Sequence, residues 1–372
     1  MGEGLIAAAR WLLAANAALV LGMALLALAD AGLCRAGLDR AWALRRRLAA
    51  STLVLALALP LALSQDWTPA APVNATELVV EQYLRGNLSG LSATALSDAL
   101  AWRGALPRML TAPDGPVAQA LAAVLLAAAT GRALWVAGAA LRLRGVVRRA
   151  RPLRRAGRLR IALSSDCAVP FAASGPWRHH VVLPARLALS PDAFRLALAH
   201  ELQHVRQGDP RFETGVALLS PLFALNPAFW ALARRMRRLR EHGCDAACIA
   251  RPGIDARAYA LCLLDVARRA AGRGGPGQGT FTVPLLGRRQ GSPRRTGSQL
   301  GHRIEMIADG PGRPAGRATG AAVLGGFCAA CVLGAWTLAA PGEWSQARLM
   351  LSSVTNLERL DAINTLARPP LR

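Results

Sequence analysis

Lysine is absent from this 372-residue sequence, so all 45 basic residues are arginine. Arginine, alanine and leucine are all abundant, which is typical of a GC-rich coding bias. The sequence pI of about 11.6 is therefore weak evidence for any particular partner. Cysteine is sparse too. Seven scattered residues, an odd number, do not form the pattern of a disulfide-stabilised secreted domain.

Charge of either sign is also scarce, because 18% of the residues are charged and 53% are apolar. That balance excludes an ordinary soluble protein of this length. Four apolar segments reach or approach the roughly 20 residues that a bilayer requires. They are 5–29, 48–63, 117–143 and 318–340. The alternative for each is a buried core helix. We predict four membrane spans.

The first span lacks the positive N-terminal flank that a signal peptide needs, since the chain starts Met-Gly-Glu-Gly. We therefore predict that this span is retained. The third span contains Arg132, which is costly in lipid unless it faces protein or water.

Arginine placement predicts the orientation of the spans. The segments 34–47 and 144–160 are rich in arginine, whereas the loop 64–116 carries three arginines against five acidic residues. The positive-inside rule puts the first two segments in the cytoplasm and the loop outside. The arginine run could instead bind nucleic acid. Its place beside a span favours the topological role, so no direct nucleic-acid partner is expected.

Histidine is scarce, with six residues, yet two of them stand four apart in the stretch LALAHELQHVRQGD. A helix is expected here, because Ser190 is a good N-cap, Pro191 suits the first helical position and Gly208 is a natural stop. Positions four apart share one face of a helix. His200 and His204 can then present imidazole nitrogens to one ion.

Glu201 is rotated by about 100° from His200 and can reach a water on that ion. This is the H-E-x-x-H pattern, two zinc ligands and a general base. The glutamate would take the proton of the water that attacks a peptide carbonyl. The alternative is a pair of histidines on an amphipathic helix without a metal.

A catalytic zinc site needs one more protein ligand and keeps one position open. A second helix is expected between residues 226 and 252, and Glu241 and Asp245 share one of its faces. Glu241 is the candidate third ligand, and Asp245 could orient a ligand histidine. His242 and Cys244 are chemically able to bind metal, but we expect them on other faces. The alternative is a solvated charge pair.

Two short strands are expected at 158–174 and 178–189, around Gly175-Pro176. A strand edge near the zinc helix could bind an extended peptide. His179 and His180 are adjacent and should face opposite sides of their strand, so we interpret them as surface residues. The Gly- and Arg-rich segment 271–317 is expected to be a mobile linker.

Five stretches of the sequence, in this order, are typical of one protein family: VPFAASGPWRHHVVLPARL, LALAHELQHVRQGD, NPAFWALARRMRRLREHGCDAACI, AYALCLLDVA and HRIEMI. Together with three spans before and one after, they resemble the membrane zinc metallopeptidases of the antibiotic sensor-transducer family, the BlaR/MecR type. The resemblance extends to about residue 340. It implies Zn²⁺ bound by His200, His204 and Glu241, with Glu201 as base and Asp245 as a supporting carboxylate.

The resemblance also implies a mainly α fold, a four-span helical membrane protein with an inserted cytoplasmic zincin-like α+β domain at 144–270. It implies a signal-transducing metalloendopeptidase in the inner membrane of a bacterium. The substrate would be a cytoplasmic protein, such as a transcriptional repressor of the winged-helix type. The chain could form a homo-oligomer. The alternative is a non-proteolytic signalling or scaffold protein with a structural or degenerate metal site, although such a site needs no base such as Glu201.

One departure from the antibiotic sensors concerns the tail 341–372, which contains no S-x-x-K motif. We therefore expect no penicillin-binding sensor domain on this chain. A stimulus would then arrive through the outer loop 64–116, the short extracytoplasmic tail, the membrane or a separate partner. The segment 272–300 is a candidate for self-cleavage or regulation.

Overall fold

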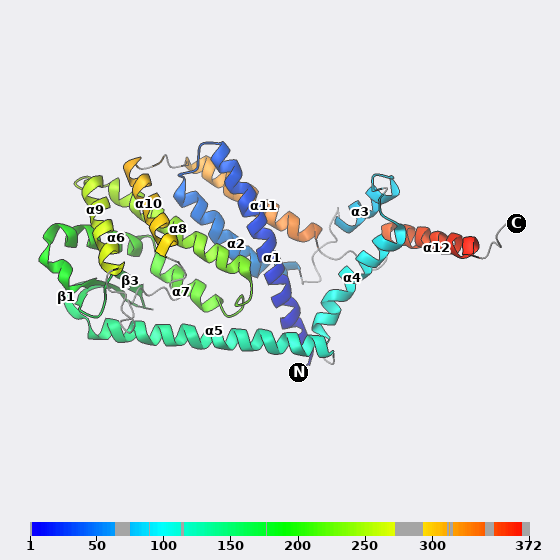
Figure 1. Cartoon of the computed structure of the whole chain (residues 1–372), viewed down its shortest axis with the longest axis horizontal. Coiled ribbons are helices and arrows are strands. Elements are labelled where there is room, and N and C mark those ends of the chain that lie inside the picture. The colour runs from blue at the N-terminus through cyan, green and yellow to red at the C-terminus, as the bar shows by residue number, and fades with distance from the viewer. Residues whose placement is uncertain are drawn as a thin grey trace. The chain divides into compact units, whose positions relative to one another are not determined.

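The structure is a computed structural model that describes residues 2–63, 75–88, 90–112, 115–175, 177–271, 293–310, 312, 315–338 and 346–366. It is mainly helical (Figure 1). The long helices α1, α2, α5 and α11 cover Gly2–Arg35, Trp42–Leu63, Pro116–Arg149 and Arg317–Thr337. The shorter helices α3, α4, α6, α7, α8, α9, α10 and α12 cover Ala75–Leu84, Ala93–Thr111, Pro191–Arg206, Asp209–Leu219, Pro227–Ile249, Ala256–Ala271, Pro293–Ala308 and Gln346–Leu366.

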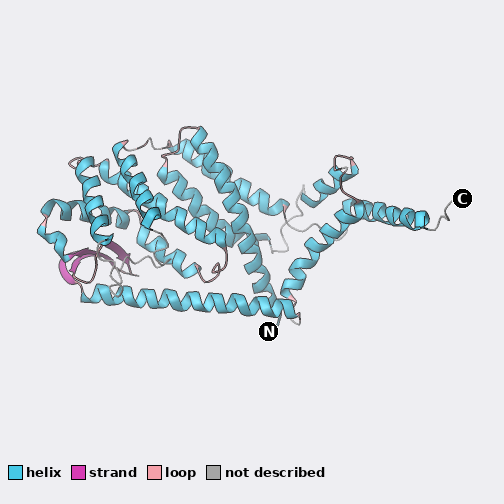
Figure 2. Ribbon diagram, viewed as in Figure 1, coloured by secondary structure: helices cyan, strands magenta, loops and turns pink. Residues whose placement is uncertain are grey.

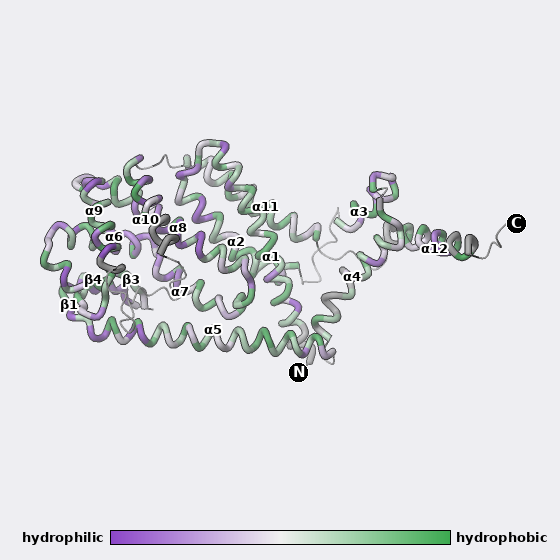
Figure 3. The backbone as a smooth tube through the Cα atoms, viewed as in Figure 1, coloured by the Kyte–Doolittle hydropathy of each residue, from purple (hydrophilic) through white to green (hydrophobic). Residues whose placement is uncertain are grey.

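The four long helices α1, α2, α5 and α11 are each long and apolar enough to cross a membrane. Figure 3 shows apolar residues along most of their length. The protein is thus membrane-embedded, and the predicted mainly α, four-span architecture with an inserted domain is confirmed. Helices α1 and α5 run further than the apolar segments 5–29 and 117–143. The backbone hydrogen bonds of a helix do not stop where its side chains become polar.

The chain divides into two compact units. The first contains residues 1–27, 51–124 and 325–372, and the second contains 28–50 and 125–324. In the first unit, small residues let the span helices approach closely. A Cβ added to Gly22 of α1 would lie 2.8 Å from Cγ2 of Thr52 in α2. Close approach at small residues is the usual way in which membrane helices pack.

The described parts of the predicted outer loop and tail are helical and pack on one another. Glu358 of α12 accepts hydrogen bonds from the backbone N–H groups of Ala93 and Thr94, at 3.1 and 3.2 Å, and from the Tyr83 hydroxyl at 3.3 Å. The N-terminus of α4 is therefore capped by an anion from α12, which suits the positive end of a helix dipole. Below this contact lies a small apolar core formed by Val80, Ala93, Leu96 and Leu351.

The second unit contains a four-stranded mixed sheet (Figure 2). Its strands β1, β2, β3 and β4 cover Arg151–Ala156, Leu159–Ser164, Phe171–Ser174 and His179–Pro184. Their spatial order is β1-β2-β4-β3. The central pair β2–β4 is parallel, and the two outer pairs are antiparallel.

The prediction of two strands was wrong in number. The first predicted strand, 158–174, is two strands, β2 and β3, and β1 lies in the arginine run where none was expected. All six residues of β1 are exposed, so no alternation of buried and exposed positions marks it in the sequence. His179 and His180 are both partly buried, and His179 Nδ1 lies 2.7 Å from the Ser174 hydroxyl.

Helix α6 packs its apolar face on this sheet. Ala197 belongs to a buried cluster with Val181 and Leu183 of β4, and Leu198 and Leu202 pack against that cluster. The spacing of these α6 residues is the helical period that marked the stretch in the sequence.

The predicted mobile linker 271–317 contains helix α10. Residues 272–292 of that segment, which include most of the candidate self-cleavage region, lie outside the described residues. In α10, Ile307 is buried against Cys244, Cys248 and Tyr259 from α8 and α9. The second half of the predicted linker is therefore a packed helix, and its contribution to the site is described below.

Candidate metal centre

Helix α6 carries the H-E-x-x-H stretch as predicted, from Pro191 to Arg206. Ser190 stands at the N-cap, but its side chain makes no capping hydrogen bond. The chain leaves the helix through Gly208, whose φ of +73° is in the left-handed region. Glycine adopts that conformation without the steric cost of a Cβ, which explains its place at this turn.

Helix α8 supplies the second half of the site, and it too begins where the sequence predicts. The Asn226 side chain accepts a hydrogen bond from the backbone N–H of Ala228 at 2.9 Å, and Pro227 takes the first helical position. Glu241 and Asp245 lie one turn apart on α8 and face α6. The two helices therefore bring together residues that are about forty positions apart in the chain.

The three candidate ligands converge in space. The Nε2 atoms of His200 and His204 are 3.2 Å apart, and each lies 3.8 Å from an oxygen of the Glu241 carboxylate. Two nitrogens bound tetrahedrally to zinc at 2.0–2.1 Å are about 3.3 Å apart. The histidine pair thus already has the separation that a bound zinc requires, and the glutamate is close to it.

His204 is held by an acid that follows the helix. Its Nδ1 donates to Asp209 Oδ2 at 2.8 Å, so that Nε2 faces His200. Asp209 is buried, and its other oxygen accepts from Arg46 Nη1 of α2 at 2.9 Å. Burial lowers the pKa of His204, but the hydrogen bond to Asp209 and the charge of Glu241 more than offset it, so the pKa rises to about 9.

His204 without a metal therefore keeps a proton on Nε2 at neutral pH, and this N–H donates to the Nε2 lone pair of His200. A divalent cation bound between the two rings would displace that proton. The two Nε2 atoms thus share one proton in the absence of a metal, and the same two atoms would bind the cation that displaces it.

His200 is oriented by a tyrosine that the sequence did not single out. The Tyr259 hydroxyl donates to Asp245 Oδ1 at 2.8 Å, and its oxygen lies 2.7 Å from His200 Nδ1. Burial and the charge of Asp245 raise the pKa of Tyr259, so the hydroxyl stays protonated. Its oxygen is then the acceptor for the Nδ1–H of His200, which leaves Nε2 free for a ligand role.

Asp245 therefore supports His200 through Tyr259, because its own oxygen is 3.6 Å from Nδ1. We expected a carboxylate that orients a ligand histidine, and the geometry adds a hydroxyl between the two. Tyr259 is one of two tyrosines in the chain, and it lies in the stretch AYALCLLDVA that carries part of the family resemblance; these were the available signals in the sequence.

Arg303 of α10 connects both acids of α8. Its guanidinium binds both oxygens of Asp245, at 2.7 and 2.8 Å, and lies 3.0 Å from Glu241 Oε2. Burial alone would raise the pKa of Glu241. The charges of Arg303 and the two histidines outweigh burial and lower the pKa to about 2. Glu241 is thus ionised, as a metal ligand must be. Arg303 lies in the predicted linker, and no spacing relates it to the motif.

Glu201, the candidate base, is 7% exposed. Burial raises the pKa of its carboxyl, and the neighbouring histidines oppose that shift. No hydrogen bond to this carboxylate occurs among the residues that the structure describes. An unpaired carboxylate with a raised pKa is suited to accept a proton.

The family model described as BlaR1 peptidase M56 matches residues 51–283, which is more than half of the chain. The chain belongs to this family. It is therefore a membrane metallopeptidase, and such an enzyme implies a bound metal and a protein substrate. No curated protein matches the chain. The matched region of this M56 peptidase ends before α10, so Arg303 lies outside it.

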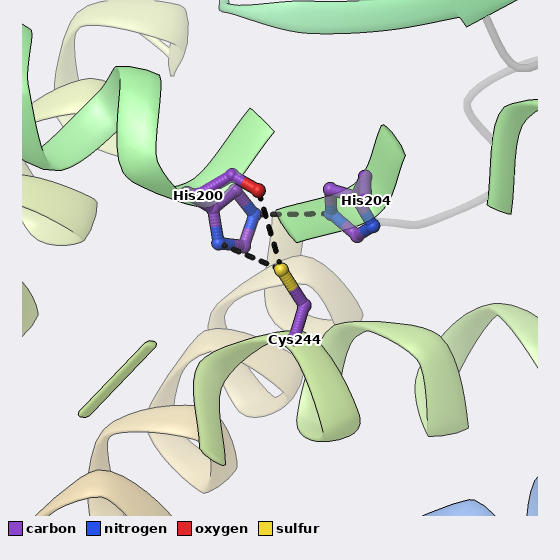
Figure 4. Close-up of side chains that lie close together, drawn as sticks. All are labelled: His200, His204 and Cys244. Atoms are coloured by element: carbon purple, nitrogen blue, oxygen red, sulfur yellow. Dashed lines mark hydrogen bonds between the residues drawn. The ribbon is translucent and has the colours of Figure 1, made fainter. Parts of the chain in front are cut away.

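Cys244 of the M56 peptidase lies closer to the histidines than we predicted. His200, His204 and Cys244 each offer a ligand atom within 4.8 Å of the others (Figure 4). The Cys244 thiol is 3.4 Å from His200 Nδ1 and 3.4 Å from the His200 carbonyl oxygen. Our expectation that Cys244 points to another face was wrong, because positions 241 and 244 are three apart and share a face.

The position of this thiol nevertheless argues against a ligand role. It contacts the Nδ1 side of His200, whereas His204 meets the Nε2 side. Burial raises the pKa of the Cys244 thiol, which keeps it neutral, and only a thiolate binds metal well. His242, the other competitor, is buried between the rings of Trp42 and His302, at centroid distances of 5.0 and 5.4 Å. Glu241 is therefore the better candidate for the third ligand.

Tyr259→Phe is expected to weaken metal binding by about 10–100-fold, the usual effect of removing a partner that orients a ligand histidine. The hydroxyl is the group that holds His200 Nδ1, and phenylalanine keeps the buried ring. Competition with a fluorescent zinc chelator would measure the change. The matched control is Tyr83→Phe, which removes the other tyrosine hydroxyl of the chain, bonded to Glu358. Equal affinities in both variants would show that Tyr259 has no such role.

Proposed function

We propose that this protein is a zinc metalloendopeptidase that acts in signal transduction and cuts a protein on the cytoplasmic side of a bacterial inner membrane. One observation carries the proposal. The Nε2 atoms of His200 and His204 face each other at 3.2 Å, with the ionised Glu241 carboxylate 3.8 Å from each. Imidazole and carboxylate are ligands that catalytic zinc sites combine, with one position left open.

In this proposal His200, His204 and Glu241 bind the zinc, and Glu201 is the general base. Zinc bound there would lower the pKa of a water molecule and polarise a peptide carbonyl. The Glu201 carboxylate accepts the proton of the attacking water and can pass it to the leaving amine. Asp209 and Tyr259 hold the two imidazoles in the tautomers that direct their Nε2 atoms to the ion.

Arg303 keeps Glu241 ionised and fixes its orientation, because the same guanidinium is anchored on Asp245 by two hydrogen bonds. A ligand held in this way loses less conformational freedom when the metal binds. The helix α10 thereby completes a site whose other residues come from α6, α7, α8 and α9.

The substrate would bind as an extended peptide along the sheet edge. Strand β3 is an edge strand, since the order of the sheet is β1-β2-β4-β3, and α6 packs beside it. An added strand gains main-chain hydrogen bonds from such an edge. The resemblance to the antibiotic sensor-transducers favours a cytoplasmic repressor of the winged-helix type as the protein cut. The arginine-rich segments 34–47 and 144–160 support the cytoplasmic side.

The metal half of this proposal is tested by metal content. Purified full-length protein in detergent, loaded in a mixture of Zn²⁺ with excess Mg²⁺ and Ca²⁺, should hold about one zinc per chain, because imidazole ligands select zinc over the hard cations. The matched control is His200→Ala combined with His204→Ala, which should hold none. Wild-type protein that binds no zinc, or binds it as weakly as the double variant, would contradict the proposal.

A further inference from the structure

A long stretch of the second unit carries no charge although it lies outside the four spans. No charged residue occurs between Glu213 and Arg234. The stretch includes most of α7, the turn after it and the first residues of α8. Three leucines on it are exposed, Leu218 to 68%, Leu222 to 37% and Leu225 to 56%. A cluster of this kind normally marks contact with a partner or a membrane.

This turn is bound to a membrane span. The Arg132 Nε of α5 donates to the Ser220 hydroxyl at 2.8 Å, and its guanidinium lies 4.2 Å from the ring centre of Trp135 and 4.8 Å from that of Trp230. Figure 1 shows α7 and the turn that follows it alongside α5. These contacts offset the cost of placing the Arg132 charge within a membrane span, because an arginine there needs a polar partner or an aromatic face.

The position of Arg132 along α5 fixes the depth of the turn. Apolar residues flank Arg132 on both sides, and the next charged residue toward the sheet is Arg142. Ten residues of helix separate the two arginines, which is about 15 Å along the axis. If Arg142 lies at the headgroups, the backbone of Arg132 lies about halfway through a hydrocarbon core of about 30 Å, and its long side chain meets Ser220 and Trp230 between that depth and the cytoplasmic headgroups.

The backbone hydrogen bonds of the turn suit a position within the membrane. Four of its N–H groups are bonded within the turn: Ser220 to Ala217 O, Leu222 to Leu219 O, Ala224 to Pro221 O and Asn226 to Phe223 O, at 3.0–3.4 Å. Pro221 and Pro227 have no N–H to satisfy, and the Trp230 Nε1–H donates to Ala224 O at 2.9 Å. Non-helical backbone at membrane depth requires this internal satisfaction.

We propose that the turn between α7 and α8 is inserted in the lipid bilayer beside α5, with Leu218, Leu222 and Leu225 facing acyl chains. The occupant of this apolar surface is lipid, because the surface continues that of a span which already meets lipid. Arginines resume on α8 directly after the stretch, and the exposed Arg234 and Arg238 can extend their guanidinium groups toward anionic headgroups.

The insertion has a consequence for the location of the metal centre. Glu241 lies seven residues after Arg234 on α8, about 10 Å along the helix. The turn also joins the helix that begins at Asp209 to the helix that carries Glu241. The centre would then lie close to the cytoplasmic membrane surface, and its two halves would be linked through a segment that contacts lipid.

Nitroxide accessibility tests the insertion. Full-length protein with Cys34→Ser, which removes the exposed cysteine, would carry a spin label at Leu222→Cys or at Leu225→Cys. It would be reconstituted in phosphatidylethanolamine–phosphatidylglycerol nanodiscs. The matched control is Leu189→Cys, because Leu189 is 87% exposed at the end of the 3₁₀ turn Ala185–Leu189 before α6. Collision rates with apolar oxygen and with a water-soluble nickel chelate would be compared at each site.

Lipid contact predicts an oxygen-to-nickel collision ratio several-fold higher at 222 and 225 than at 189. A ratio equal to that of position 189 would show that the turn lies in water and would overturn the inference. Slow collision with both reagents would overturn it as well, because a protein surface such as a second copy would then cover the turn. The leucines chosen for labelling are surface residues. Cys34→Ser protein without an added cysteine, treated with the same spin label, corrects for any reaction of the other thiols.

Discussion

Glu201→Gln is expected to slow peptide-bond hydrolysis by about 10²–10⁴-fold, the contribution of a positioned general base. The substitution keeps the size of the side chain and removes the basic oxygen. Glu201 is buried next to the two histidines, and its pKa is raised by that burial, so the carboxylate is poised to accept a proton. Zinc content should stay near that of the wild type, because Glu201 is not one of the three converging ligands.

This effect would be measured by comparing the new protein N-termini that appear in cells expressing the wild type or each variant. Wild-type protein should generate cleavage products that Glu201→Gln does not. The matched control is Glu305→Gln, the same chemical change on the exposed surface of α10, where the Glu305 carboxylate contacts the exposed His302. A Glu201→Gln protein that retains both its zinc and the wild-type cleavage products would refute the assignment of the base.

Glu241→Ala is expected to weaken zinc binding by more than the 10–100-fold caused by loss of an outer partner, because it removes one of the three proposed ligands. Cys244→Ser should bind zinc as the wild type does. The reason is geometric. Glu241 offers oxygens to the Nε2 side of both histidines, whereas the Cys244 thiol lies on the Nδ1 side of His200 and is held neutral by burial.

Zinc affinities of these two variants decide between the His-His-Glu and His-His-Cys sets. The opposite result, in which Cys244→Ser loses the metal and Glu241→Ala retains it, would assign the thiol as the third ligand. Glu241→Gln is a useful intermediate, since its amide keeps the volume and one weak ligand oxygen. Loss of Glu241 should not release α10, because Arg303 keeps both of its hydrogen bonds to Asp245.

Glu201→Gln and Glu241→Ala together also separate the peptidase from the alternative of a metal-binding scaffold. A structural site would depend on Glu241 but not on Glu201, so Glu201→Gln would leave every function of such a scaffold intact. A peptidase depends on both residues, one for the metal and the other for the proton. Membership of the M56 family already favours the peptidase.

Short-range features of the site could be predicted from the sequence. The four-residue spacings of His200 with His204 and of Glu241 with Asp245 place each pair on one helical face, whatever the helix packs against. The Asn226 cap marks where α8 begins, Pro191 marks the first position of α6, and Gly208 follows the end of α6. The apolar segments 5–29, 48–63, 117–143 and 318–340, of 16 to 27 residues, reach or approach the length of a membrane span, which the thickness of the bilayer sets.

Other features depend on contacts between segments that are distant in the chain. Tyr259 reaches His200 across 59 positions, and Arg303 reaches Asp245 across 58. Both residues lie in stretches that carry the family resemblance, AYALCLLDVA and HRIEMI, but no periodicity encodes which face of α9 or α10 meets α8, so neither was predicted to contact the site. The exposed strand β1 and the docking of α12 on α4 through Glu358 are likewise matters of packing.

The sequence by itself thus determined four apolar spans and two helices, each with a pair of candidate site residues on one face. Only the tertiary structure decided how those ligands are held and what surrounds them: the hydroxyl between Asp245 and His200, the arginine on Glu241, and the turn bound to Arg132. The physical reason is one of range. Helical faces follow from local backbone geometry, whereas the partner of a buried polar group is chosen by the packing of the whole unit.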